Sequence, residues 1–294
     1  MEIPEVKVFN FVHEVYPLID AKPHFTSKTY KDKVVIITGG SEGIGATAAL
    51  FYAKAGAKLV LVARNIKELE ERKTAIEKHV SGSEILVVAG DISDVEVGKL
   101  AVQAAVQKWN RVDIVVANSG TEQGGAAKFH QKDPLGWWHT QEVNVRGTLN
   151  IVHAAIPELL ETNGQVIAVS SALAHARVPI LADYSISKHT IDRFVEILAL
   201  DYPELSLYSV HPGVILTPGS SDIAERMGMP KKINMPDTAE LPAATFLWLT
   251  ARNAEFLSGR YIQATWDLND VVAKKDEIVR DDLLVTKLAG PKLA

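Results

Sequence analysis

Short apolar runs recur along the chain and alternate with segments of mixed polarity. Six of these runs consist mainly of β-branched and aliphatic residues, such as VVIIT at 34–38 and IVVA at 114–117. A short run that is apolar throughout is typical of a strand buried on both faces of a parallel sheet. The sequence predicts strands at residues 34–38, 59–62, 85–88, 114–117, 166–169 and 207–210, and a last strand within 258–264.

The segments between these runs place apolar residues at helical spacing. They predict helices at residues 44–55, 66–80, 95–109, 134–160 and 184–200. A strand that alternates with a helix this many times predicts an α/β fold with a doubly wound parallel sheet. No Pro- or Gly-rich linker interrupts the alternation, so we expect a single domain over residues 31–264.

Two flanking segments lie outside this domain. Residues 1–30 form an N-terminal extension whose aromatic residues are expected to pack on the body of the protein. Residues 265–294 form a C-terminal tail, and its amphipathic pattern from Asp267 onward predicts a tail helix. Docking of this helix on its own body or on another subunit stays open.

Composition excludes several classes of function. The 294-residue chain has 31 Lys and Arg against 36 acidic residues, so its net charge of −5 gives no bulk attraction to nucleic acid or an anionic membrane. It has no cysteine, and its nine histidines never lie within four residues of each other, so we expect no metal site. No apolar stretch approaches the ~20 residues of a membrane span. Because Glu2 and Pro4 do not suit a secretory signal, a cytoplasmic protein is expected.

The first predicted strand leads directly into the loop TGGSEGIG, from Thr38 to Gly45, and then into a helix. Glycines allow a tight turn and a close backbone approach, and a helix N-terminus presents free N–H groups and a positive dipole end to a pyrophosphate. A glycine triplet alone also fits an ordinary strand-to-helix turn. The strand before it and the helix after it favour a dinucleotide site in a Rossmann-type domain.

Several motifs, in the same order, resemble those of the short-chain dehydrogenases/reductases (SDR). The glycine loop resembles the TGxxxGxG loop of that family, and ANSG at 117–120 resembles its NNAG motif, with Ser119 in place of the usual Ala. HPGVILT at 211–217 resembles the PGxxxT segment that closes over the nicotinamide. The resemblance implies that the following residues bind the cofactor: Thr38, Gly39, Ser41, Gly43, Ile44, Gly45, Asp91, Ile92, Asn118, Ser119, Gly120, Tyr184, Lys188, Pro212, Gly213, Val214 and Thr217.

The end of the second predicted strand bears on the choice of dinucleotide. An acidic residue there would bind a ribose 2′-hydroxyl, whereas an arginine accommodates a 2′-phosphate through bidentate hydrogen bonds. The strand ends in Ala63 and Arg64, which predicts NADP(H). Glu42 favours NAD(H) instead, because some NADP(H)-preferring members of the family place a basic residue at that point of the loop.

Tyr184 and Lys188 lie four residues apart at the start of a predicted helix, which places both on one face. A phenol has a pKa near 10 and a nearby cation favours phenolate, so we expect Lys188 to lower the pKa of Tyr184 toward working pH. Alone, such a pair is more often a surface coincidence. The resemblance implies a catalytic tetrad of Asn144, Ser171, Tyr184 and Lys188, in which Ser171 holds the substrate oxygen and Asn144 orders a water in a proton relay to Lys188.

These features predict an NADP(H)-dependent oxidoreductase that reduces a ketone or aldehyde by hydride transfer, with Tyr184 as the general acid. An NAD(+)-dependent alcohol dehydrogenase and a non-catalytic dinucleotide-binding regulator are the alternatives. His175 is expected to be a structural histidine. The substrate is expected to meet a mainly apolar pocket formed by residues 122–130, 173–182 and 217–238, the last of which contains Met227, Met229 and Met235.

Both flanks are similar to those of fungal members of the family, some of which reduce carbonyls in secondary metabolism. A polyketide-like or other bulky ketone is therefore a plausible substrate. The resemblance also implies a homodimer or homotetramer, formed through the helix from Pro134 and the helix from Tyr184. The sequence pattern of these amphipathic helices would be the same if they packed only on the core of a monomer.

Overall fold

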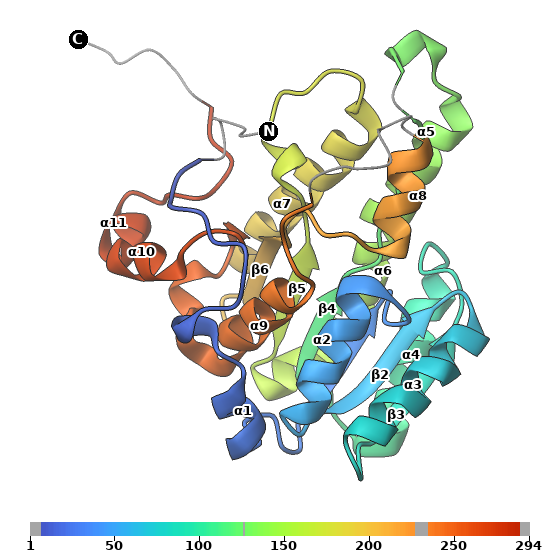
Figure 1. The fold of residues 1–294 in the computed structure, drawn as a ribbon, viewed down its shortest axis with the longest axis vertical. Helices are drawn as coiled ribbons and strands as arrows, with labels where there is room; N and C mark the ends of the chain where they lie inside the picture. Colours follow the sequence, from blue (N-terminus) through green and yellow to red (C-terminus); the bar gives the residue numbers. More distant parts are fainter. Residues whose placement is uncertain (1–6, 126, 227–234, 289–294) are drawn as a thin grey trace.

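A seven-stranded parallel sheet forms the centre of the protein in a computed structural model, which describes residues 7–125, 127–226 and 235–288. The strand order is β3-β2-β1-β4-β5-β6-β7, which confirms the α/β doubly wound fold and the predicted last strand (Figure 1). In register, Val35 of β1 lies between Leu59 of β2 and Ile114 of β4. The strands are β1 Val34–Thr38, β2 Lys58–Ala63, β3 Ile85–Ala89, β4 Ile114–Ala117, β5 Gln165–Val169, β6 Ser206–His211 and β7 Arg260–Gln263.

Helices cover both faces of the sheet. Alternate residues of β1 point to opposite sides, so Val35 and Ile37 pack in one core and Val34 and Ile36 in the other. This two-sided burial explains why the strands read as continuous apolar runs rather than alternating ones. The first core packs against α2 Gly43–Lys54, α3 Ile66–His79 and α9 Glu240–Trp248, and the second against α4 Val95–Trp109, α6 Gly147–Thr162 and α7 Ala182–Asp201.

Short polar side chains set the helix ends. Asn65 accepts hydrogen bonds from the Lys67 and Glu68 amides and so caps α3, and Asp94 accepts from the Glu96 amide and caps α4. Asn163 ends α6 in the left-handed conformation, with φ of 47°. Within the described ranges, no helix is long and apolar enough to cross a membrane.

The expected helix at 134–160 is interrupted in the structure. It consists of α5 Pro134–Gln141, a π-helical turn at Glu142–Arg146 and α6. A π-turn inserts one extra residue into the helical ladder and is frequent at functional sites. Helical periodicity does not reveal it, because the chain stays helical on both sides of the turn.

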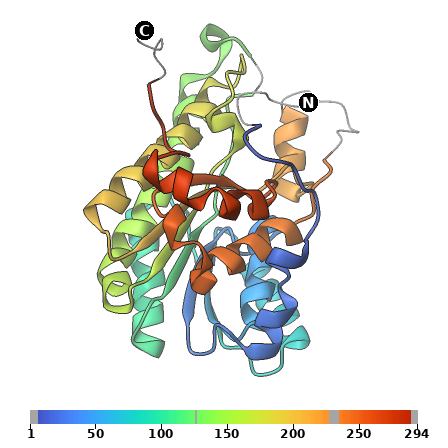
Figure 2. The same ribbon diagram turned by 90° about the vertical axis from the view of Figure 1, so that its left-hand side faces the viewer.

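The N-terminal extension and the C-terminal tail pack side by side on the body (Figures 1 and 2). Phe11 forms an antiparallel bridge with Trp266, and the Phe9 ring meets the Trp266 ring edge-on at 5.1 Å. The predicted tail helix is instead two short helices, α10 Leu268–Ala273 and α11 Lys275–Arg280, because Lys274 departs from helical geometry at the junction. The chain then turns back, and the Tyr261 amide donates to the Leu284 carbonyl.

The remaining short elements are η2 Pro17–Ile19, α1 Lys22–Ser27, η3 Phe129–Gln131, η5 Ala172–Ala174, α8 Pro218–Arg226, a π-turn at Leu249–Asn253 and η7 Glu255–Leu257.

Replacement of Trp266 tests whether the two flanks stabilise the domain. Trp266 is 1% exposed and contacts both Phe9 and Tyr261, so Trp266→Ala should lower the free energy of unfolding by about 3–5 kcal/mol. Urea denaturation measures this loss. The control Trp138→Ala, at a side chain that is 59% exposed, should cost much less. Equal losses in the two variants would show that the flanks add nothing to the core.

Candidate active site

The loops that leave the carboxyl ends of β1, β2, β4, β5 and β6 meet at one edge of the sheet, where open α/β sheets bind their ligands. In the glycine loop, Gly39 and Gly43 have φ of 65° and 53°, which favours glycine. A Cβ at Gly45 would collide with the Gly39 carbonyl oxygen. The helix α2 begins at Gly43 without a side-chain cap, so its first N–H groups stay available. The loop and helix end fit the pyrophosphate of a dinucleotide.

The ANSG segment holds the glycine loop in place. The amides of Asn118 and Ser119 both donate to Thr38 Oγ1 at 3.0 Å, and Asn118 Nδ2 donates to the Thr38 carbonyl at 3.0 Å. Gly120, the last residue of the segment, lies next to Lys188, because a Cβ at this position would be 3.3 Å from Lys188 Nζ. The segment therefore connects the predicted cofactor loop to the predicted catalytic residues.

Arg64 is exposed at the end of β2, and a second arginine that the sequence analysis missed lies beside it. Arg72 Nε donates to the Ser41 carbonyl of the glycine loop at 3.0 Å. Arg72 lies within α3, whereas Arg64 precedes that helix, so helical periodicity does not reveal that Arg72 reaches the glycine loop. Burial and the charges of Glu68 and Asp222 raise the pKa of Glu42, while Arg64 and Arg72 oppose this rise. Two cations thus face the one acidic residue of the loop.

Asp91 and Ile92 follow β3 on the same side of the site. Burial raises the pKa of Asp91, but hydrogen bonds from the Ser93 amide and hydroxyl, together with the charge of Arg64, bring it below its ordinary value. Ile92 is buried, and its carbonyl accepts from Asn150 Nδ2 at 2.9 Å. Asp91 is thus an ionised group within the field of Arg64.

The segment from Pro212 to Thr217 closes the other side of the glycine loop. Pro212 is buried, Gly213 has φ of 110°, and a Cβ at Gly43 would lie 3.0 Å from Thr217 Cγ2.

Asp237 fastens this segment from the far end of the 217–238 loop. Asp237 accepts from the Val214 amide at 2.6 Å and forms an ion pair, also at 2.6 Å, with His13 of the N-terminal extension when that histidine is protonated. The extension therefore reaches the predicted nicotinamide side.

The hydroxyl of Ser171 lies beside the hydroxyl of Tyr184 and favours its ionised form. Ser171 ends the segment after β5 and caps η5 by accepting from the Leu173 amide at 3.2 Å. Burial raises the pKa of Tyr184, the neighbouring hydroxyl of Ser171 opposes this rise, and the charge of Glu122 adds to it. The expected lowering of this pKa is therefore wrong, because desolvation of the phenolate is the largest influence on it.

Lys188 is 3% exposed, and its Nζ donates to the Val169 carbonyl at 2.7 Å. Burial lowers its pKa from 10.5 to about 8, although the charge of Asp192 opposes this shift. Lys188 Nζ lies 5.8 Å from the centre of the Tyr184 ring, so the predicted pair does face one another. Burial favours the neutral amine form of Lys188, and this form does not stabilise a Tyr184 phenolate by charge.

Asn144 lies in the π-turn and is fully buried. Its Oδ1 accepts from the Thr121 amide at 2.7 Å, and its Nδ2 donates to the Thr121 carbonyl and to Ser187 Oγ, both at 2.9 Å. Ser187 in turn donates to the Tyr184 carbonyl at 2.7 Å. Asn144 thus joins the loop after β4 to the helix that carries Tyr184 and Lys188.

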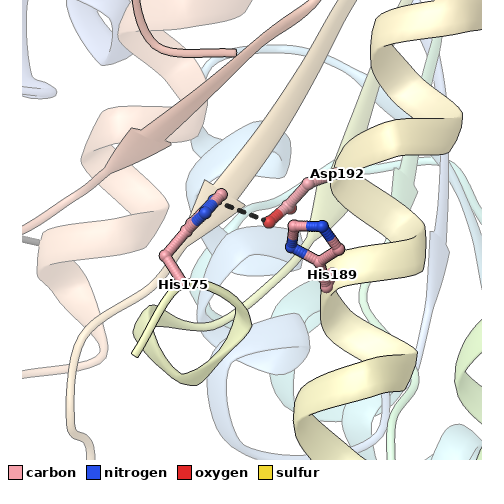
Figure 3. A group of neighbouring side chains, drawn as sticks. All are labelled: His175, His189 and Asp192. Carbon is pink, nitrogen blue, oxygen red and sulfur yellow. Dashed lines mark ion pairs between the residues drawn. The ribbon is translucent and has the colours of Figure 1, made fainter. Parts of the chain in front are cut away.

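His175, His189 and Asp192 form a cluster of neighbouring side chains (Figure 3). His175 Nε2 is 3.0 Å from Asp192 Oδ2, and Ser209 donates to the other oxygen of Asp192. His189 Nδ1 faces the Ala174 carbonyl at 3.1 Å. Sequence spacing gave no sign of this cluster, because its histidines are 14 residues apart. These contacts offset the cost of burying the Asp192 carboxylate, which lies one helical turn from Lys188.

The expected substrate loop is described only in part. Its first portion forms α8, and Ser220 Oγ donates to the Met235 sulfur at 4.0 Å. Met227 and Met229 lie outside the described residues. The nearby side chains Ile180, Val214 and Leu216 are exposed apolar groups at the carboxyl edge of the sheet.

Comparison with known proteins agrees with the fold. A family model for short chain dehydrogenases matches residues 33–228. The short chain dehydrogenase pigC of Monascus ruber is 32% identical over 285 residues, with 94% of this chain and 91% of the relative covered. The short chain dehydrogenase andI of Emericella variicolor is 32% identical over 280 residues and covers 92% of each chain. Both relatives are fungal proteins.

A solved structure of L-sorbose reductase from Gluconobacter frateurii, complexed with NADPH and L-sorbose, superposes with a TM-score of 0.71. It is 24% identical, and the match covers 81% of this chain and 96% of the other. This likeness shows the same fold.

The buried ammonium of Lys188 should make the protein less stable at neutral pH than a neutral side chain would. Since its folded pKa of about 8 lies below 10.5, protonation at pH 7 costs up to about 3 kcal/mol, partly offset by the hydrogen bond to Val169. Lys188→Met should therefore be at least as stable as wild type at pH 7. Between pH 8 and 10.5 the unfolded state binds more protons, so wild type should gain stability relative to the variant.

Urea denaturation of both proteins across this pH range measures the difference. Lys67→Met, at an exposed lysine, is the control and should show no such pH dependence. A difference between wild type and Lys188→Met that stays constant from pH 7 to 10 would mean that Lys188 is not desolvated.

Proposed function

The chain belongs to the short-chain dehydrogenase family, and from this premise we propose that it is an NADP(H)-dependent reductase of ketones or aldehydes. The observation that carries the proposal is that the Ser171 and Tyr184 hydroxyls lie side by side, with Lys188 Nζ 5.8 Å from the centre of the phenol ring. Two hydroxyls that converge in this way suit a carbonyl oxygen that becomes an alkoxide. A non-catalytic regulator would not need a buried lysine that costs stability.

In the proposed mechanism, Ser171 and Tyr184 hold the carbonyl oxygen of the substrate. The bound nicotinamide would supply the hydride that adds to the carbonyl carbon. Tyr184 donates its proton to the oxygen as negative charge develops there, and Ser171 donates a hydrogen bond that stabilises that charge. In the reverse direction, Tyr184 takes the proton from the alcohol. The raised pKa of Tyr184 keeps the phenol protonated, which is the form that reduction requires.

Lys188 and Asn144 support this proton transfer. Lys188, with a pKa of about 8, holds or releases a proton near neutral pH, and its ammonium form stabilises a Tyr184 phenolate. Asn144 fixes Thr121 and Ser187 on either side of the site, so the tyrosine helix and the loop after β4 keep their spacing. We propose that solvent protons reach Lys188 through a water held near Asn144.

Arg64 and Arg72 are the residues proposed to hold the 2′-phosphate of NADP(H). Arg72 is anchored on the Ser41 carbonyl, and Arg64 is free to turn its guanidinium toward an added phosphate. Glu42 favours the second candidate, an NAD(+)-dependent alcohol dehydrogenase. The nearby acidic residues Glu68 and Asp222 weaken that candidate, since they favour protonation of Glu42 and so reduce its repulsion of a phosphate.

The proposed substrate is a bulky, mainly apolar carbonyl compound, such as a polyketide-like ketone. The exposed apolar side chains Ile180, Val214 and Leu216 support this choice. We also propose a cytoplasmic homo-oligomer, because the outer faces of α5 and α7 expose Leu135, by 80%, and Leu200, by 76%.

Tyr184→Phe should bind the dinucleotide as wild type does but lose roughly 10²- to 10⁴-fold in kcat for any carbonyl that the protein reduces, because the proton donor is gone. Steady-state oxidation of NADPH with a panel of ketones and aldehydes measures this loss. Tyr202→Phe, at a partly buried tyrosine outside the site, is the control. Full turnover by Tyr184→Phe would remove the acid–base role.

Wild type should bind NADPH at least tenfold more tightly than NADH, a difference of about 1.4 kcal/mol. Arg64→Asp should lose this preference, since a carboxylate repels the 2′-phosphate and accepts from a ribose hydroxyl. Fluorescence titration with each cofactor measures both affinities, and Arg280→Asp on α11 is the control. Equal or tighter binding of NADH by wild type would support the alcohol dehydrogenase.

A further inference from the structure

Three ionisable side chains that the mechanism does not use are buried together beside Tyr184. Glu122, Lys132 and Asp183 are 1%, 7% and 0% exposed, and they come from the loop after β4, the residue after η3 and the first turn of α7. Lys132 Nζ is 2.5 Å from Asp183 Oδ1, which makes a buried ion pair. The loop packs tightly on this pair, because a Cβ at Gly124 would lie 3.0 Å from Lys132 Nζ and collide with Asp183 Oδ2.

The Lys132–Asp183 ion pair has no net charge, and Glu122 is a third ionisable group next to it. Neither carboxyl oxygen of Glu122 has a hydrogen-bond partner of standard geometry among the described residues, although the Gly125 amide and Asp183 face it. Burial and then the charge of Asp183 raise the pKa of Glu122. The one cation of the cluster, Lys132, is already paired with Asp183, and a buried carboxylate without a partner is costly, so the surroundings favour the protonated form of Glu122.

Two structural connections link this cluster to Tyr184. Asp183 directly precedes Tyr184 in α7, and Glu122 directly follows Thr121, whose amide and carbonyl are both bound by Asn144. The groups that act on the phenol are the neighbouring Ser171 hydroxyl, Lys188 with its Nζ 5.8 Å from the ring centre, and Glu122 through its charge. Glu122 is the one of these three that disfavours phenolate when it ionises.

We infer that Glu122 is a positioning residue of the active site: with Asp183 and Lys132 it forms a buried unit whose charge sets how readily Tyr184 releases its proton. While Glu122 is protonated, the unit is neutral and the phenolate forms against no added charge. When Glu122 ionises, the new negative charge opposes the phenolate. This inference rests on the proposed function for its consequence in catalysis, but the coupling itself needs no substrate.

The test is an ultraviolet titration of the phenolate in wild type and in Glu122→Gln, each compared with the same protein that also carries Tyr184→Phe. The difference isolates Tyr184 among the seven tyrosines. Glutamine keeps the shape and the hydrogen bonding of the protonated acid but cannot ionise. Tyr184 should therefore ionise at lower pH in Glu122→Gln, with a several-fold larger phenolate fraction at a fixed pH below the transition.

Glu71→Gln, at an exposed glutamate on α3, should leave the transition unchanged. If Glu122→Gln does not fold, Glu122→Leu serves the same purpose and should shift the transition in the same direction. A Tyr184 transition at the same pH in wild type and in the variant would overturn the inference. A shifted transition in a protein that reduces no carbonyl would instead leave the inference standing and remove the proposed function.

Discussion

The burial of one ammonium group governs the arrangement of the active site. Lys188 lies under the carboxyl end of β5, where its Nζ has the Val169 carbonyl as its hydrogen-bond partner. Desolvation brings its pKa to about 8, and the Asp192 carboxylate one turn away keeps it from falling further. Asp192 is itself buried and depends on Ser209 and His175. A series of polar contacts thus connects Lys188, through Asp192, to β6 and to the loop before α7.

The same edge of the sheet is fastened by contacts between distant segments. Thr38 Oγ1 accepts hydrogen bonds from two amides of the ANSG segment, which ties the glycine loop to the loop after β4. Asp237 holds the Val214 amide and contacts His13, which links the N-terminal extension to the segment that closes the site. The extension and the tail are in this sense part of the domain that they flank.

Charge is distributed around Tyr184 so that its protonated form is the resting one. Burial raises the pKa of the phenol, and Ser171 and Glu122 act in opposite directions on it. Such an arrangement suits a general acid, because the proton is present until charge develops on the substrate. It also explains why the site costs stability, since a buried ammonium, a buried acid and a buried ion pair are each maintained against solvation.

The sequence by itself determined the alternation of strands and helices, the glycine loop and the Tyr184–Lys188 pair, because these depend on local periodicity and on residues close together in the chain. The six apolar runs and the segment at 258–264 also predicted the seven strands of the parallel sheet. Only the tertiary structure decided the π-turn at Asn144, the second arginine on the cofactor loop and the contact of Asp183 with Lys132, which is 51 residues away. The direction of the pKa of Tyr184 belongs to this second group. Desolvation depends on how completely several distant segments exclude water, and no spacing within one helix carries that information.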